Sequence, residues 1–162
     1  MYQIPIEQKK RVSCAITGHR NLPNNFNREN AKSQLRALIE DGIKTFYNGL
    51  AIGFDLTTAE LLLELKETYP QIRLHGCIPF YGQERYYTAE EAELYRRIVS
   101  KCDEVTVLDE AYHRSSYFKR NDYMIEQADV LYAYCTADHG GTAYTLKNFI
   151  RKKGEENVVR YE

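Results

Sequence analysis

The sequence lacks the segments that would place the chain in a membrane or direct it out of the cell. No run of apolar residues approaches the roughly 18 that a membrane-spanning helix needs. The first eleven residues are polar, end in Lys9, Lys10 and Arg11, and contain no apolar stretch of the kind found in a secretory signal. We therefore expect a cytoplasmic protein without a membrane partner.

Cysteine is scarce, and its spacing matches neither a zinc site nor a redox pair. The four cysteines are Cys14, Cys77, Cys102 and Cys135. None lies in a C-x-x-C pair, and no histidine is placed to complete a zinc set. Cys14, Cys77 and Cys135 lie in or beside apolar runs, which predicts small buried side chains in a reducing compartment. A catalytic cysteine is a weaker alternative, and we expect neither a metal nor a cofactor.

An excess of positive charge is also missing. The chain has 22 Lys and Arg residues against 23 Asp and Glu residues, with a net charge of -1. A dedicated nucleic-acid binder usually shows a basic excess. A local basic groove stays compatible with this balance, but nucleic acid is not expected as a partner.

What the sequence has is a regular alternation of strand-like and helix-like segments. Its 162 residues fit one domain, 1–162, with a core at about 12–153. The predicted strands are 12–17, 45–51, 72–78, 104–108, 130–135 and 157–161, and the predicted helices are 27–44, 56–68, 88–102, 116–128 and 142–153. Pro79 is expected to stop the third strand. The alternation predicts an α/β fold: a single Rossmann-like domain with a mostly parallel sheet and helices on both faces. A homo-oligomer is an open alternative.

In such a fold, ligands bind outside the carboxyl ends of the strands. Glycine, arginine, aromatic and hydroxyl residues follow the predicted strands, so they are expected at one edge of the sheet. Gly18, His19 and Arg20 follow the first strand, and the arginine suits bidentate phosphate binding. His19 is interpreted as a donor, a general acid or a packed turn residue.

The segment "GLAIGFD", residues 49–55, combines two glycines with the start of a helix. Gly53 can take a positive φ, and the helix N-terminus offers free N–H groups to an anion. Asp55 is a natural N-cap, or it could hold a ribose hydroxyl. A glycine turn with an aspartate cap is as good an interpretation of Gly49, Gly53 and Asp55 as a ligand site.

The segment "HGGT", residues 139–142, is a second glycine site. Gly140 and Gly141 precede Thr142, which can cap the last helix, and the combination makes a plausible phosphate cradle. It is not a Walker loop, because no lysine follows the second glycine.

Three further residues are weaker candidates. Arg120 and Asn121 lie in the predicted fourth helix and could point back at the sheet edge, although a solvated polar face is the usual reading of such a run. Tyr81 follows the third strand and could stack on a base. With fourteen tyrosines in the chain, an ordinary surface role for Tyr81 is an equally open interpretation.

Taken together, "TGHR", "GLAIGFD", "IPFYGQERY", "KRNDYMIEQADVLYAY" and "GGT" before a helix resemble the YpsA-like branch of the SLOG superfamily. That superfamily also contains the LOG cytokinin-activating hydrolases and the DNA-processing protein DprA. The resemblance implies a pocket for a nucleotide-like small molecule such as ADP-ribose, in a sensor or regulatory protein. The ligand set that it implies is Gly18, Arg20, Gly49, Gly53, Asp55, Arg120, Asn121, Gly140, Gly141 and Thr142.

The catalytic residue of the LOG hydrolases has no counterpart in the matching motif. Their signature P-G-G-x-G-T-x-x-E ends in a catalytic glutamate, and Thr145 stands at that position here. A threonine hydroxyl cannot take up a proton as a carboxylate can. Catalytic residues therefore stay unassigned. The alternatives are a hydrolase of an N-glycosidic or phosphoribosyl bond, with Asp55 or Glu84 as acid or base, and a single-stranded nucleic-acid accessory module.

Overall fold

The computed structural model describes residues 10–162. The expectation drawn from the polar N-terminal segment rests mostly on residues 1–9, which lie outside the described residues. Among residues 10–162, every helix falls short of the length and apolar character that a bilayer span requires.

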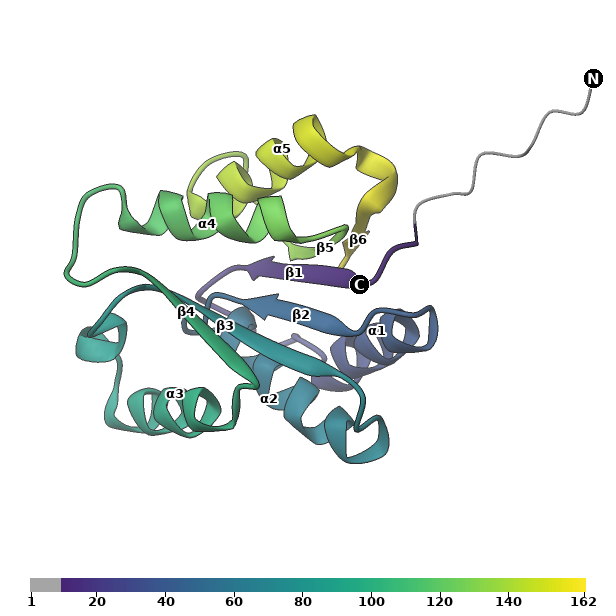
Figure 1. Cartoon of the computed structure of the whole chain (residues 1–162), viewed down its shortest axis with the longest axis horizontal. Coiled ribbons are helices and arrows are strands. Elements are labelled where there is room, and N and C mark those ends of the chain that lie inside the picture. The colour runs from purple at the N-terminus through teal and green to yellow at the C-terminus, as the bar shows by residue number, and fades with distance from the viewer. Residues whose placement is uncertain (1–9) are drawn as a thin grey trace, which may run out of the picture.

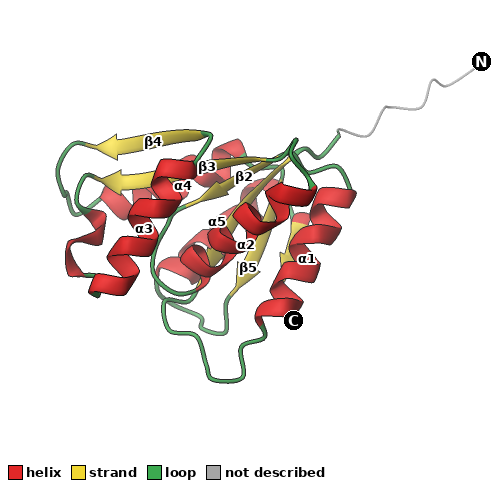
Figure 2. Ribbon diagram, turned by 90° about the horizontal axis from the view of Figure 1, so that it is seen from below, coloured by secondary structure: helices red, strands yellow, loops and turns green. Residues whose placement is uncertain are grey.

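The described residues form one six-stranded sheet in which every neighbouring pair of strands is parallel. The strand order is β4-β3-β2-β1-β5-β6. The strands are β1 Ser13–Gly18, β2 Thr45–Asn48, β3 Arg73–Phe80, β4 Glu104–Asp109, β5 Val130–Tyr134 and β6 Val158–Arg160. Figure 2 shows β4 at one edge of the molecule and α1 toward the opposite side.

Helices cover both faces of this sheet, as Figure 1 shows. They are α1 Arg28–Glu40, α2 Phe54–Thr68, α3 Ala89–Lys101, α4 Ser116–Gln127 and α5 Gly141–Lys153, with short 3-10 turns at η1 Gln83–Tyr86 and η2 Glu155–Asn157. α1, α2 and α3 pack on one face, and α4 and α5 on the other. Because both faces are covered, β1, β3 and β5 are buried over consecutive residues, whereas the short β2 alternates. The predicted Rossmann-like α/β fold is confirmed.

The strand order reverses beside β1. The chain first runs outward from β1 through β2 and β3 to β4, then returns through α4 to β5 on the other side of β1. Parallel sheets with such a reversal leave a crevice at the carboxyl ends of the strands where the order changes. The segments that follow β1 and β5 are therefore the ones placed to line a site.

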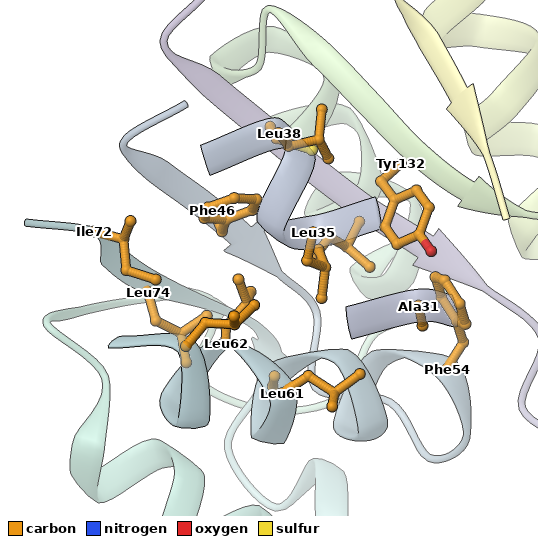
Figure 3. Close-up of a cluster of buried hydrophobic side chains, with 14 of the residues drawn as sticks. Ala31, Leu35, Leu38, Phe46, Phe54, Leu61, Leu62, Ile72, Leu74 and Tyr132 are labelled. Carbon is orange, nitrogen blue, oxygen red and sulfur yellow. The ribbon is translucent and has the colours of Figure 1, made fainter. Parts of the chain in front are cut away.

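The larger apolar core lies between the sheet and the layer of α1 and α2. Figure 3 shows Leu35 and Leu38 of α1, Leu61 and Leu62 of α2 and Phe46 of β2 gathered in this layer. Leu35, Phe46 and Leu61 are fully buried. Fully burying a side chain of this kind contributes about 1.5–3 kcal/mol, so the core holds the sheet edge as a stable base for its loops.

Several element boundaries differ from the sequence expectation, among them the end of β2 at Asn48 rather than Ala51, and two of the differences have a clear physical reason. α1 ends at Glu40 rather than Lys44, because Gly42 takes a φ of 113° and turns the chain toward β2. β3 continues through Pro79 to Phe80. Pairing of β3 with β2 stops at Gly76, and pairing with β4 runs from His75 to Ile78 and resumes at Phe80, so no neighbouring strand requires an N–H from Pro79.

Candidate functional site

A cavity of ≈ 440 Å³ opens at the point where the strand order reverses. It is bounded by β1 and the loop after it, the loop before α2, α4, and the start of α5. Of the twelve predicted ligand residues, nine line it: Gly18, His19, Arg20, Asp55, Arg120, Asn121, Gly140, Gly141 and Thr142. The remaining three, Gly49, Gly53 and Tyr81, lie elsewhere.

The start of α5 forms an open wall of this cavity. Gly140 is the N-cap, with a φ of 94°, and no side chain among the described residues caps the helix. A Cβ built on Gly140 or Gly141 meets nothing within 4 Å. The first N–H groups of a helix have no partner inside the helix, and the helix dipole makes this end positive. The α5 N-terminus is therefore an accessible site for an anion.

Thr142 does not cap α5 as the sequence predicted. Its hydroxyl donates to the backbone oxygen of Gly18 at 3.0 Å, which ties α5 to the end of β1. Thr145, one turn later, is buried and donates to the oxygen of Gly141 at 3.0 Å. The Thr142 hydroxyl therefore holds the start of α5 against the sheet edge, and the Thr145 hydroxyl binds within the first turns of the helix.

The start of α2 is closed by the loop that follows β1. The N–H of Phe54 donates to the oxygen of His19 at 3.1 Å. Gly53 has a φ of 81°, and a Cβ there would lie 2.3 Å from the oxygen of Arg20. A Cβ on Gly18 would lie 2.3 Å from the ring of Phe54. These glycines therefore allow the β1 loop and α2 to pack closely.

Arg120 is a buried residue that binds the protein's own backbone. One guanidinium nitrogen, Nη1, donates to the oxygen of Gly49 at 2.7 Å, and Nε donates to Oδ1 of Asn121 at 2.8 Å. A Cβ on Gly49 would lie 2.5 Å from Nη1 of Arg120. Gly49 thus makes room for Arg120, and the Arg120 guanidinium joins α4 to the loop after β2.

Asp55 is the second residue of α2 and does not cap it, because Gly53 holds the cap position. Its Oδ2 accepts from the N–H of Ala51 at 3.3 Å, whereas Oδ1 is buried without a hydrogen-bond partner in the described chain. Burial raises the pKa of Asp55 to about 6, against opposing effects of Arg120, the Ala51 N–H and Arg20. A buried acceptor with no partner is costly, and this cost distinguishes Asp55 from the other residues that line the cavity.

His19 has a structural contact on the outer side of the cavity. The N–H of Thr136 donates to its Nε2 at 2.7 Å, so that nitrogen carries no proton. The ring also contacts Tyr134 edge-on at 5.2 Å. His19 therefore links the loops after β1 and β5, and its Nε2 is not free to act on a ligand.

Two residues that the sequence analysis did not select line the cavity as well. Arg114 is exposed in the connection between β4 and α4, and Tyr117 lies in the first turn of α4. The guanidinium carbons of Arg20 and Arg120 lie 5.5 Å and 5.7 Å from the centre of the Tyr117 ring. Arg114 lies in the segment that follows β4, and this position is the feature of the sequence that could have identified it as a site residue.

The charge of the lining is predominantly positive. Arg20, Arg114 and Arg120 line the cavity, and of its lining residues in the described chain Asp55 alone carries a carboxylate. Arg20 and Arg114 form no ion pair with another described residue. This arrangement favours an anionic ligand.

Tyr81 and Glu84 lie at a different surface, beside α3 and β4. Tyr81 is 64% exposed there. Because Glu84 is not in the cavity, it cannot form a carboxylate pair with Asp55, which is what hydrolysis of a glycosidic bond usually requires. Within residues 10–162, no group of three or more His, Cys, Asp or Glu side chains could hold a metal ion.

The family model described as the YspA SLOG family, YpsA, matches residues 14–161. The chain belongs to the YpsA SLOG family. This confirms the resemblance that the motifs indicated.

Curated relatives are UPF0398 proteins. That of Bacillus pumilus is 35% identical over 119 residues, covering 72% of this chain and 64% of the relative. That of Bacillus cereus is 31% identical over 133 residues, covering 80% and 72%. The chain thus matches less than two thirds of the Bacillus pumilus protein.

Two solved structures of DNA processing protein A share the fold of this family member. The Helicobacter pylori protein aligns with a TM-score of 0.67 at 17% identity, over 93% of this chain and 65% of that one. The Streptococcus pneumoniae protein aligns with a TM-score of 0.67 at 15% identity, over 93% and 50%. At these identities the likeness establishes the fold.

The expectation that excluded nucleic acid as a partner is wrong. It rested on net charge, yet the Helicobacter pylori protein of the same fold is described for its single-stranded DNA binding mode. Net charge averages over the whole surface, whereas the cavity described above concentrates three arginines at one sheet edge. A near-neutral chain can therefore present a local anion-binding surface.

Proposed function

We propose that this chain binds a phosphate-bearing nucleotide or nucleotide-derived ligand, such as ADP-ribose, in the cavity between β1, α4 and α5, as a sensor or regulatory protein. One observation carries the proposal. The same cavity is lined by the open N-terminus of α5, by two arginines without an acidic partner among residues 10–162, and by a buried carboxylate oxygen without a hydrogen-bond partner in that range.

The phosphate is assigned to the α5 end of the cavity. There the N–H groups of the first turn are uncapped, and Gly140 and Gly141 leave space for close approach. Arg20 and Arg114 add charge and planar donors that suit phosphate oxygens. The combination of a helix N-terminus with arginine side chains is a recurrent phosphate site.

The nucleoside part is assigned to the inner end, near Asp55 and Tyr117. Oδ1 of Asp55 needs a donor, and a sugar hydroxyl or a base amino group supplies one. The Tyr117 ring offers a face or edge for a base. A cavity of ≈ 440 Å³ lies within the range of about 300–1,000 Å³ that small-molecule sites occupy.

Arg20→Ala tests the assignment with isothermal titration calorimetry of AMP, ADP, ADP-ribose and NAD. Loss of a hydrogen bond to a charged group costs about 1.5–3 kcal/mol, so affinity should fall roughly tenfold to a hundredfold. Arg20 is exposed, so the melting temperature should stay unchanged. Arg96→Ala is the matched control, because Arg96 is an exposed arginine of α3 on the other face of the sheet. Equal affinities in both variants, or no binding of any of the four probes, would contradict the proposal.

Single-stranded DNA is the second candidate, and the shared fold with the Helicobacter pylori protein is the observation that favours it. Phosphate contacts make strand binding steeply dependent on salt, because bound counterions are released. We expect an oligonucleotide bound in this way to lose affinity sharply between about 50 and 200 mM salt. Strand binding that depends on Arg20 and exceeds that of every mononucleotide would favour this candidate over the first. Absence of strand binding at low salt would remove it.

A further inference from the structure

A second hollow adjoins the candidate cavity across the start of α5. It has a volume of ≈ 440 Å³ and lies between α4 and α5. Phe118, His139, Gly140 and Gly141 line both hollows, and the outer one is completed by Asp138, Ala143, Tyr144, Lys147 and Asn148. We call the second hollow the outer groove.

We propose that the outer groove holds a second nucleoside-sized unit of the ligand, which crosses from the inner cavity over Gly140 and Gly141. This inference rests on the proposed function, because the inner cavity is taken to hold the phosphate and the first unit. The chemical class is two nucleoside units joined through phosphate. A dinucleotide coenzyme and two successive nucleotides of a DNA strand both have this chemistry.

The glycine at position 141 supports a crossing at this point. Gly140 has a φ of 94°, so its backbone conformation requires glycine. Gly141 has no positive φ, and a Cβ there would meet no atom within 4 Å. Neither backbone conformation nor packing therefore explains the absence of a side chain at this residue of α5. Open space directly above its backbone, shared by both hollows, does explain it.

The outer groove is built to receive a flat ring. The ring of Phe118 is 48% exposed, and it meets the ring of Tyr144 at 4.8 Å with an angle of 73° between them. The Tyr144 hydroxyl donates to Oδ1 of Asp122 at 2.9 Å, which fixes the orientation of that ring. A base placed in this corner would stack on one ring and meet the edge of the other.

A second observation, independent of the helix N-terminus, supports the inner cavity as a ligand site. Asp55 is 6% exposed, and its Oδ1 is buried without a hydrogen-bond partner in residues 10–162. Asp55 lines the inner cavity and not the outer groove, whereas Tyr144 lines the outer groove and not the inner cavity. A ligand that reaches both Asp55 and Tyr144 therefore occupies both hollows, which share Gly140 and Gly141.

The experiment compares one-unit and two-unit probes on wild type and Tyr144→Ala by isothermal titration calorimetry, because Tyr144 lines the outer groove alone. AMP is the one-unit probe, and NAD and a 5′-phosphorylated deoxyadenosine dinucleotide are the two-unit probes. Stacking of one base contributes an affinity of about tenfold. We therefore expect at least one two-unit probe to bind wild type about tenfold more tightly than AMP does. Tyr144→Ala should remove this advantage and leave AMP unchanged, because Tyr144 does not line the inner cavity.

Two further variants control for loss of fold and of surface area. Tyr144→Phe keeps the ring and should keep the advantage. Tyr86→Ala removes an aromatic ring that is 93% exposed and lines neither hollow, so it should have no effect. An advantage for NAD alone assigns a dinucleotide coenzyme, and an advantage for the DNA dinucleotide alone assigns a strand.

Three results would overturn the inference, and they separate its failure from that of the proposed function. If AMP binds and neither two-unit probe binds more tightly, the outer groove is not used and the proposed function stands. If Tyr144→Ala weakens AMP as much as the two-unit probes, the two hollows are one site. If no probe binds at all, including AMP, the proposed function and the inference fall together.

Discussion

A glycine with positive φ precedes the first helical residue of both α2 and α5, with φ of 81° at Gly53 and 94° at Gly140. The surroundings of the two glycines differ. A Cβ on Gly53 would lie 2.3 Å from the oxygen of Arg20, whereas a Cβ on Gly140 would meet nothing within 4 Å. The N–H of Phe54 at the start of α2 is bound to the oxygen of His19. The start of α5 is uncapped and faces the cavity.

This difference shows that a glycine before a helix can have either of two structural roles. At α2 the glycine lets another loop of the same protein come close, and that loop takes the N–H that an anion would need. At α5 the glycine leaves space open at a helix end that attracts anions. The local sequence is similar in the two cases, and the path of the β1 loop decides between them.

Gly53→Ala gives the largest expected effect on this comparison. The variant combines a disfavoured positive φ with overlap against a backbone oxygen, and together these cost about 3 kcal/mol or more. For a chain of this size the melting temperature should fall by roughly 6–12 °C. Gly140→Ala is the matched control, since it keeps the strain of a positive φ without the overlap, and should cost about 1–2 kcal/mol. Thermal unfolding of both variants measures the difference, and equal losses would show that the two helix starts are packed alike.

The fold could be predicted from sequence because its signals are local and repeated. Apolar strand-like runs alternate with amphipathic helices, and this pattern predicts a parallel sheet covered on both faces. The failure at Pro79 has a different origin. A proline ends a strand where a neighbouring strand needs a hydrogen bond from the missing N–H. For Pro79 of β3, the point at which β2 ends decides whether such a bond is needed. The exact extent of the neighbouring strand is not visible in the sequence around Pro79.

Asp55→Asn addresses a second difference between the two helix starts, because α2 carries a buried carboxyl group in its first turn and α5 carries no acid there. Burial raises the pKa of Asp55 from 3.8 to about 6, so the folded protein holds the proton more tightly than the unfolded chain does. The neutral carboxyl group therefore adds to the free energy of unfolding in full below about pH 3.8. This addition is lost as pH rises through about 6. Above that pH the ionised carboxylate costs on the order of 3 kcal/mol.

Urea unfolding of wild type and Asp55→Asn at about pH 4 and pH 7.5 measures this cost. Relative to the variant, wild type should lose about 2–3 kcal/mol of unfolding free energy over this range. Glu93→Gln removes an exposed carboxylate of α3 and should change the pH dependence little. A difference between wild type and Asp55→Asn that is the same at both pH values would show that Oδ1 is solvated in the folded protein.

The candidate site was only partly predictable from the sequence. Residues that follow β1 and β5 were expected at one sheet edge, and the structure places Gly18, Arg20 and Gly141 there together. Gly49 was predicted for the same set, but it makes room for the buried Arg120 side chain, a contact between residues 71 positions apart. Tyr81 follows β3, which is separated from β1 by β2, so its loop lies away from the reversal of strand order. Contacts between residues distant in sequence therefore determine which of the predicted residues line the cavity.

Gly141→Ala gives the smallest expected change in stability and the sharpest contrast with Gly53→Ala. Alanine is a better helix former than glycine, and the built Cβ meets no atom, so the variant should be more stable by up to about 1 kcal/mol. The added methyl group would occupy the space through which a phosphate approaches the first N–H groups of α5, so affinity for ADP should fall by roughly tenfold. Differential scanning calorimetry and ADP titration measure the two effects on one sample.

Lower stability would mean that the start of α5 is packed as tightly as that of α2. Unchanged affinity would mean that the phosphate does not lie above Gly141, and the glycine would then have no explanation in either packing or binding.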